Sequence, residues 1–218
     1  MAEINFLDLH PSANRDYDAR AKSKTPEIIR TAKQFGKKFF DGPREYGYGG
    51  YNYDGRWKPV VEVMKKHYAL REDAAILDIG CGKGFMLHDF KEAIPQGSVA
   101  GIDVSEYAIE NAMDSVKPWL KLGSAEKLPF PDDSFDLVIA INSIHNLHLE
   151  PCIEALKEIE RVSRGNSYIT VDAWRNEAER LSLMKWVLTA ETMMPVDDWV
   201  KLFGEIGYSG DYWWFIAD

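Results

Sequence analysis

The apolar positions of this chain form two kinds of pattern, which follow one another along the sequence. Continuous apolar runs at 75–79, 99–104 and 135–142 are typical of parallel strands buried on both faces of a sheet. Stripes with a spacing of three or four residues, as at 151–164, favour amphipathic helices. This alternation predicts an α/β fold with a mostly parallel sheet and helices on both of its faces.

Shorter patterns complete the list of expected elements. Weaker strands are expected at 119–122, 167–173 and 211–216, and no pattern marks a clear strand between the last two. Helices are expected at 59–68, 86–93, 106–116, 176–192 and 196–206.

The first 57 residues read differently from the rest of the chain. Residues 1–24 have no clear period and are expected to lie on the domain as an arm. Thr25, Pro26 and Glu27 are typical of a helix start, and an apolar stripe continues from there to about residue 41. We expect residues 1–57 to form an arm and lid of the same domain as residues 58–218.

The strand at 75–79 runs into a glycine loop, Gly80-Cys81-Gly82-Lys83-Gly84, which opens the next helix. Glycines allow a sharp turn and a close approach of ligand to backbone, and a helix N-terminus favours an anion. Asp103 follows 19 residues after Gly84, at the tip of the next strand. A carboxylate there can bind a ribose diol, so this half of the fold is expected to bind a nucleoside.

The loop spacing is G-x-G-x-G, with Asp78 two positions before it, rather than the dinucleotide fingerprint G-x-G-x-x-G. With GIDVS at 101–105 and GSAEKLPFPDDSFDLVIA at 123–140, the segment resembles the class I S-adenosylmethionine-dependent methyltransferases, of the type 11-like group. The resemblance covers roughly residues 74–145 and extends more loosely to the C-terminus. It implies a Rossmann-like sheet of seven strands, the last of them antiparallel.

The resemblance also implies a binding mode for S-adenosylmethionine and for its product, S-adenosylhomocysteine. The glycine loop would pass beneath the methionine part, Asp103 would bind the ribose hydroxyls, and Val104 would pack on the adenine. Ser124 stands where the family often has an acidic residue that holds the adenine amino group. The expected cofactor residues are Asp78, Gly80, Cys81, Gly82, Gly84, Asp103, Val104, Ser124, Ala125, Glu126 and Asn142.

Candidate catalytic residues follow the run at 135–142. Methyl transfer is an in-line displacement that needs a base only when the acceptor must lose a proton. His145 and His148 lie just past the strand, on the ligand side of an open α/β sheet, and either could accept that proton or orient the acceptor. Their spacing also suits a metal, but no third ligand stands nearby, and we expect none.

The acceptor side is expected to come from the segment after the first helix, which has four tyrosines and four glycines within ten residues. Tyrosines suit loops that close over small ligands. This loop, followed by Gly-Arg-Trp, resembles uncharacterised bacterial methyltransferases from surface-polysaccharide gene clusters. The expected substrate residues are Arg44, Tyr46, Tyr48, Tyr51, Tyr53 and Arg56, with Trp174 and Arg175 after the strand at 167–173.

We therefore expect methyl transfer to a small polar acceptor, with a hydroxyl oxygen favoured over nitrogen. A phosphorylated or nucleotide-linked intermediate of surface-polysaccharide or secondary metabolism fits this class. Two alternatives remain open at this point. One is a nicotinamide-dependent oxidoreductase, which shares the strand, loop and ribose carboxylate, and the other is a non-catalytic, cofactor-binding partner subunit with the same fold.

Composition and charge restrict the expected partners and compartment of the protein. The formal net charge of −9 argues against a nucleic-acid partner. No apolar run approaches the roughly 18 residues of a membrane span, and the first residues do not resemble a signal peptide. Cys81 and Cys152 are the only cysteines, so no disulfide framework is expected and the cytoplasm is the expected compartment.

Overall fold

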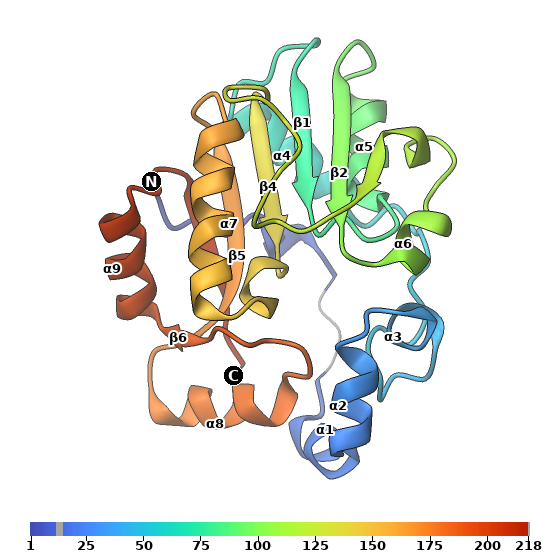
Figure 1. Cartoon of the computed structure of the whole chain (residues 1–218), viewed down its shortest axis with the longest axis vertical. Coiled ribbons are helices and arrows are strands. Elements are labelled where there is room, and N and C mark those ends of the chain that lie inside the picture. Colours follow the sequence, from blue (N-terminus) through green and yellow to red (C-terminus); the bar gives the residue numbers. More distant parts are fainter. Residues whose placement is uncertain (12–14, 218) are drawn as a thin grey trace.

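A seven-stranded sheet forms the centre of the computed structural model, which describes residues 1–11 and 15–217 (Figure 1). Its strands are β1 (Ala75–Ile79), β2 (Ser98–Asp103), β3 (Leu120–Leu122), β4 (Leu137–Ile141), β5 (Ser167–Trp174), β6 (Met194–Pro195) and β7 (Asp211–Phe215). They follow the order β3-β2-β1-β4-β5-β6, and β7 also pairs with β5. The predicted α/β class and seven-stranded sheet are confirmed.

Helices cover both faces of this sheet. They are α1 (Tyr17–Ser23), α2 (Pro26–Ala32), α3 (Lys37–Asp41), α4 (Lys58–His67), α5 (Phe85–Ala93), α6 (Glu106–Glu110), α7 (Leu149–Val162), α8 (Glu177–Trp186) and α9 (Val196–Ile206). Ile76 and Ile139 pack with α4 and α5 in one apolar cluster, whereas Leu77 and Val138 pack with α7 and α9 in another. Because successive strand residues serve two cores, the strands read as continuous apolar runs.

The far edge of the sheet differs from the expectation. The last strand was expected to be antiparallel, and that prediction is wrong: β7 runs parallel to β5, with Tyr168 opposite Asp211 and Asp172 opposite Phe215. The two-residue β6 pairs only with the end of β5, and α9 then carries the chain back to the start of β5. A helical crossover of this kind joins parallel strands, whereas a hairpin joins antiparallel ones.

Residues before the first helix complete that edge. The backbone N–H of Ile4 donates to the carbonyl oxygen of Tyr212 at 2.9 Å, and the N–H of Tyr212 donates to Ala2 at 3.0 Å. The short 3₁₀ helix that follows, Phe6–Leu9, buries Phe6, whose ring lies 4.9 Å from that of Tyr168. Part of the expected arm is therefore fixed to the main body of the protein.

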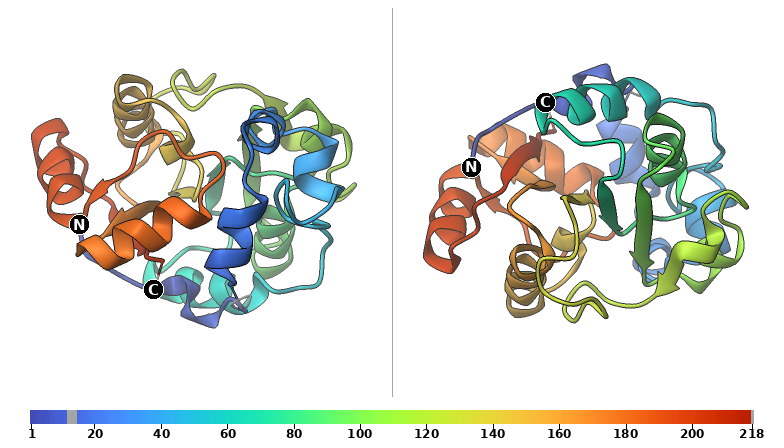
Figure 2. Two further views of the ribbon diagram at one scale, coloured as in Figure 1. Left: turned by 90° about the horizontal axis from the view of Figure 1, so that it is seen from below. Right: turned by 90° about the horizontal axis from the view of Figure 1, so that it is seen from above.

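A cap lies beyond the carboxyl ends of the strands, formed by α1, α2 and α3 together with α8 (Figure 1). Helices α1 and α8, which are far apart in the sequence, lie side by side (Figure 2). The single helix expected from residue 25 to about 41 is instead two helices, because Phe35 adopts a left-handed conformation (φ 47°) before Gly36. Phe40 of α3 is buried, with its ring 5.7 Å from those of Tyr48 and Tyr51.

Other element ends shift as well. Helix α6 stops at Glu110 rather than at 116, and α8 stops at Trp186 rather than at 192. Among the described residues, no helix combines the length and the apolar character needed to cross a bilayer.

Candidate active site

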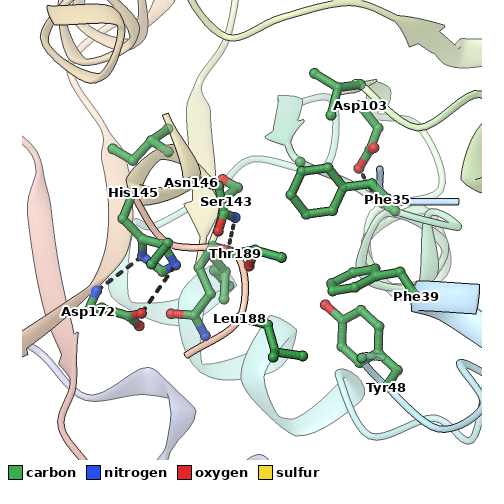
Figure 3. Close-up of a pocket in the computed structure, with 18 of the residues that line it drawn as sticks. Phe35, Phe39, Tyr48, Asp103, Ser143, His145, Asn146, Asp172, Leu188 and Thr189 are labelled. Carbon is green, nitrogen blue, oxygen red and sulfur yellow. Dashed lines mark hydrogen bonds and ion pairs between the residues drawn. The ribbon is translucent and has the colours of Figure 1, made fainter. Parts of the chain in front are cut away.

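A cavity of about 390 Å³ lies between the carboxyl ends of the central strands and the cap (Figure 3). Ligands of open α/β sheets bind at this edge, where the loops after the strands converge. One wall comes from the loops after β1 and β2, another from the segment after β4, and the cap forms the third.

The glycine loop after β1 forms the floor of the cavity. Gly80 and Gly82 line it, with φ of 78° and 54°, values that other residues rarely adopt. A Cβ on Gly80 would lie 2.3 Å from the Cβ of Ser143, so the approach of β4 also requires glycine there. Gly84 caps α5 and, like the buried Cys81, lies outside the cavity lining.

Asp103, at the end of β2, holds this loop in place. Its Oδ2 accepts a hydrogen bond from the N–H of Gly82 and its Oδ1 one from Ser105, both at 2.7 Å. Burial raises the pKa of Asp103, while those N–H groups act in the opposite direction. The carboxylate lines the cavity beside the ring of Phe35 and keeps acceptor capacity for a ribose hydroxyl (Figure 3).

Asp78 is a buried carboxylate that receives no hydrogen bond from the described residues. Burial, followed by the neighbouring charge of Asp103, raises the pKa of Asp78 to about 7. The group lies below the loop, outside the cavity lining. A cationic ligand above the loop would stabilise its charged form.

His145 and Asp172 form the opposite wall (Figure 3). The Nδ1 of His145 accepts a hydrogen bond from the backbone N–H of Asp172 at 3.1 Å, and its Nε2 lies 3.7 Å from Oδ2 of the same residue. Burial lowers the pKa of the His145 ring, although Asp172 opposes the shift. The ring is therefore neutral at pH 7, with its proton on Nε2 facing the carboxylate.

The side chain of Asp172 reaches the cavity from within β5. Burial raises the pKa of Asp172, and the neighbouring His145 and Arg15 oppose this shift. Its carbonyl oxygen accepts a hydrogen bond from the indole of Trp199 at 3.1 Å, which fixes this part of the strand. Two buried carboxylates, Asp103 and Asp172, thus face one cavity from opposite sides.

The structure brings together about half of the residues that were expected at the site. The cavity is lined by the predicted residues Arg44, Tyr48, Tyr51, Gly80, Gly82, Asp103, Val104, Ser124, Ala125, Asn142 and His145. Outside its lining lie Tyr46, Tyr53, Arg56, Asp78, Cys81, Gly84, Glu126, His148, Trp174 and Arg175.

Several of those outside have other partners. Tyr53 donates to Asp89 at 2.5 Å, Arg56 pairs with Asp54, and the side chain of His148 is 75% exposed on the surface. Their roles in catalysis or binding stay predictions, and the geometry gives them no access to the cavity.

Sequence reasoning missed part of the lining. The missed residues with polar or large aromatic side chains are Arg15, Arg20, Phe35, Phe39, Phe40, Asn146, Asp172, Trp186, Thr189 and Phe215. Asp172 had a usable signal, because it is an acidic residue inside an otherwise apolar run. The two arginines had none, since they lie in the stretch without periodicity.

Comparisons with known proteins identify the family of this chain. The family described as "Methyltransferase domain" matches residues 76–166. A demethylmenaquinone methyltransferase of Symbiobacterium thermophilum is 30% identical over 191 residues, covering 80% of this chain and 72% of that protein. An uncharacterized methyltransferase of Schizosaccharomyces pombe is 32% identical over 106 residues, and the matched segments are 43% of this chain and 37% of that protein.

Among solved structures, the YcgJ protein of Bacillus subtilis superposes with a TM-score of 0.53 at 22% identity, over 67% of this chain and 66% of its own. This likeness supports the fold alone. The residues present fit S-adenosylmethionine. Gly80 and Gly82 leave room for its methionine part, and Asp103 can accept hydrogen bonds from its ribose. The carboxylate of Asp78 can balance a positive charge of the ligand. The matches favour methyl transfer over the oxidoreductase alternative, and the chain belongs to the class I S-adenosylmethionine-dependent methyltransferases.

Proposed function

We propose that this protein methylates a hydroxyl oxygen of a small polar acceptor, bound between the His145–Asp172 wall and the cap. The observation that carries the proposal is the position of Asp172, a buried carboxylate on the side of the cavity opposite Asp103. S-adenosylmethionine, when bound, supplies an electrophilic sulfonium methyl group. The chain has to hold it, align the acceptor and keep water out.

The cofactor half of the cavity is assigned to the residues nearest Asp103. The carboxylate of Asp103 accepts hydrogen bonds from the ribose hydroxyls, and Val104 packs on the adenine beside Ser124 and Ala125. The backbone of Gly80 to Gly82 cradles the methionine part, with Asp78 beneath it. This assignment places the transferable methyl group near Asn142 and Ser143, which lie between the two walls.

On the acceptor side, we assign proton removal to Asp172. S-adenosylmethionine, when bound, would supply the methyl group, and Asp172 would accept the proton that the acceptor hydroxyl loses as it is methylated. A raised pKa makes this carboxylate a better proton acceptor. His145 is then a positioning residue, because its Nδ1 lone pair is already engaged by a backbone N–H and its Nε2–H faces Asp172.

The test is transfer of labelled methyl from S-adenosylmethionine to a panel of alcohols, phenols, phosphorylated and nucleotide-linked sugars, amines and a short-chain demethylmenaquinone. Demethylmenaquinone is included because relatives are named for it. Methylation of amines alone would contradict the proposal. The suggested place in surface-polysaccharide metabolism stays a prediction, which the sugar members of the panel address.

Variants separate the two halves of the cavity. Asp172→Asn should lower kcat by about 10²- to 10⁴-fold, as loss of a general base does, and leave S-adenosylhomocysteine affinity within twofold or so. Asp103→Ala should weaken S-adenosylhomocysteine binding by about tenfold or more, since it removes the charged carboxylate that accepts hydrogen bonds from the ribose hydroxyls. Full activity of Asp172→Asn with hydroxyl acceptors would refute the assigned base.

A further inference from the structure

Three arginines gather on the cap side of the cavity. Arg15 precedes α1, Arg20 lies within it, and Arg44 follows α3, and all three line the cavity. The guanidinium carbons of Arg15, Arg20 and Arg44 lie 5.7, 4.9 and 5.5 Å from the ring centroid of Trp186, at the end of α8. Segments distant in the sequence thus bring three cations around one aromatic ring.

No carboxylate of the described residues forms an ion pair with these three arginines. Of the other seven arginines, Arg56, Arg71, Arg161, Arg164 and Arg180 lie within ion-pair distance of an acidic side chain, and the two that do not, Arg30 and Arg175, are exposed. The contrast is notable because the chain carries a net charge of −9, so acidic partners are plentiful. Within the part of the chain that the structure describes, the cluster therefore has no carboxylate at ion-pair distance.

The cluster is nevertheless held in place. Arg20 is 9% exposed, and its Nη1 donates to the carbonyl oxygens of Arg44 at 3.1 Å and Glu45 at 2.9 Å. Arg44 in turn donates to the carbonyl oxygen of Gly47. These bonds fix the side chains of Arg20 and Arg44 without neutralising them, and the charge of Arg44 adds to burial in lowering the pKa of Arg20.

Fixed guanidinium groups in a partly enclosed site are suited to oxyanions. A guanidinium presents paired N–H donors that match the two oxygens of a carboxylate or phosphate, and neighbouring like charges are stabilised when an anion lies among them. The cavity carboxylate of Asp172 lies 3.7 Å from Nε2 of His145 and beyond ion-pair distance of Arg15. An anion brought by the ligand would complete the site.

We infer that Arg15, Arg20 and Arg44 form an oxyanion-binding subsite, and that the methyl acceptor carries a carboxylate or phosphate group in addition to its hydroxyl. The inference rests on the proposed function for the identity of the acceptor. The oxyanion lies against the cap at Trp186, and the hydroxyl lies near Asp172. The aromatic side chains of Phe39, Tyr48 and Trp186 also line the cavity and offer flat apolar surfaces to the acceptor.

The direct test uses the S-adenosylhomocysteine complex of the full chain and small probes. Inorganic phosphate, benzoate and the neutral isostere benzamide are titrated while the NMR signals of the arginine Nε–H groups and the Trp186 indole are followed. Phosphate or benzoate should shift these signals saturably, and benzamide should bind at least tenfold more weakly. Comparing phosphate with benzoate identifies which oxyanion the site prefers.

The double variant Arg15→Gln/Arg44→Gln keeps the buried Arg20 and should weaken anion binding at least tenfold, with benzamide and S-adenosylhomocysteine binding unchanged. Arg180→Gln is the matched control, because Arg180 lies on α8 and pairs with Glu177 outside the cavity. Melting of each variant with S-adenosylhomocysteine establishes that it folds. Equal binding of benzoate and benzamide by the wild type, or undiminished anion binding by the double variant, would overturn the inference.

Transfer assays keep this result apart from the proposed function. Hydroxyl acceptors should be methylated faster when they carry a phosphate or carboxylate, and the advantage should vanish in the double variant. Saturable anion binding without methyl transfer to any hydroxyl would support the subsite and count against oxygen as the methylated atom.

Discussion

The fold perturbs the ionisation of Asp78, the carboxylate beneath the glycine loop. It is buried beneath the glycine loop, near a second carboxylate, and accepts no hydrogen bond from the described residues. A carboxyl group in these surroundings favours its neutral form. A cationic ligand bound at the loop above Asp78 would give this carboxylate the partner that the described residues do not supply.

The pH dependence of the ligand-free protein follows from that residue. The pKa of Asp78 is about 7 when folded, above its ordinary value of 3.8, so its contribution to stability is full below about pH 4 and is lost as pH rises through 7. The total change is on the order of 4 kcal/mol. In thermal melts without ligand, the stability of Asp78→Asn relative to the wild type should increase as the pH rises from 5 to 8.

Bound ligand should remove most of that difference. S-adenosylhomocysteine carries an ammonium group, so its affinity should increase with pH across the same interval as Asp78 ionises. Isothermal titration at several pH values measures this. A pH-independent affinity in the wild type, matching that of Asp78→Asn, would show that the cofactor does not sense Asp78.

At the residue scale, the sequence predicted what local spacing encodes. The glycine loop and Asp103 belong to one contiguous strand–loop–helix–strand unit, so their positions relative to one another follow from the chain itself. Asp172, Arg15 and Arg20 reach the cavity through contacts between distant segments. His145 was found because it follows a strand, but the hydrogen bond that engages its Nδ1 comes from β5 and has no local signature.

Between elements, the cap is fastened to the glycine loop by one charged contact. The Nζ of Lys83 lies 2.8 and 2.7 Å from the two carboxylate oxygens of Asp41 at the end of α3, and 3.0 Å from the carbonyl oxygen of Tyr51. Tyr107 on α6 donates to the same carboxylate at 2.7 Å. Lys83 is 7% exposed, so this contact joins α3, α6 and the loop in a largely buried setting.

Lys83→Met should therefore loosen the cap. It leaves Asp41 without its cation, which costs about 1–3 kcal/mol in a partly buried pair and should weaken S-adenosylhomocysteine binding severalfold. Hydrogen exchange across residues 37–51 should become faster, while the strands remain protected. The control is Lys58→Met, whose pair with Glu92 is exposed and screened by solvent, so its loss should have little effect. Equal effects of the two variants would refute a special role for the Lys83 contact.

Element prediction succeeded where periodicity decides and failed where tertiary contacts decide. The central strands and α4, α5, α7 and α9 follow from their apolar patterns. The break between α2 and α3 does not, because Phe35 is held by a hydrogen bond from the Ser105 hydroxyl to its carbonyl oxygen. Strand β6 has two residues, too few for a pattern, and the direction of β7 depends on how α9 crosses the sheet.

At the scale of the whole molecule, two distant segments close one cavity. The cap combines residues 17–41 with α8, so ligand binding should restrain both at once. S-adenosylhomocysteine at about 100 times its Kd should add about 2.7 kcal/mol of stability, or roughly 5–10 °C in Tm for a chain of this size. Hydrogen exchange should slow in both segments together. Slowing confined to the glycine loop would show that the cap does not close on the cofactor.

The pairing of the first residues with β7 bears on the order in which the protein can assemble during synthesis. Ile4 bonds to Tyr212, so the sheet edge that anchors the N-terminal segment exists only once the last strand has emerged from the ribosome. Contacts this far apart in the chain are slow to form. The glycine loop and Asp103 can be in place long before, whereas the wall carrying Arg15 and Arg20 is completed last. A nascent chain that has not reached β7 would thus have the glycine loop and Asp103 in place before its N-terminal segment is anchored.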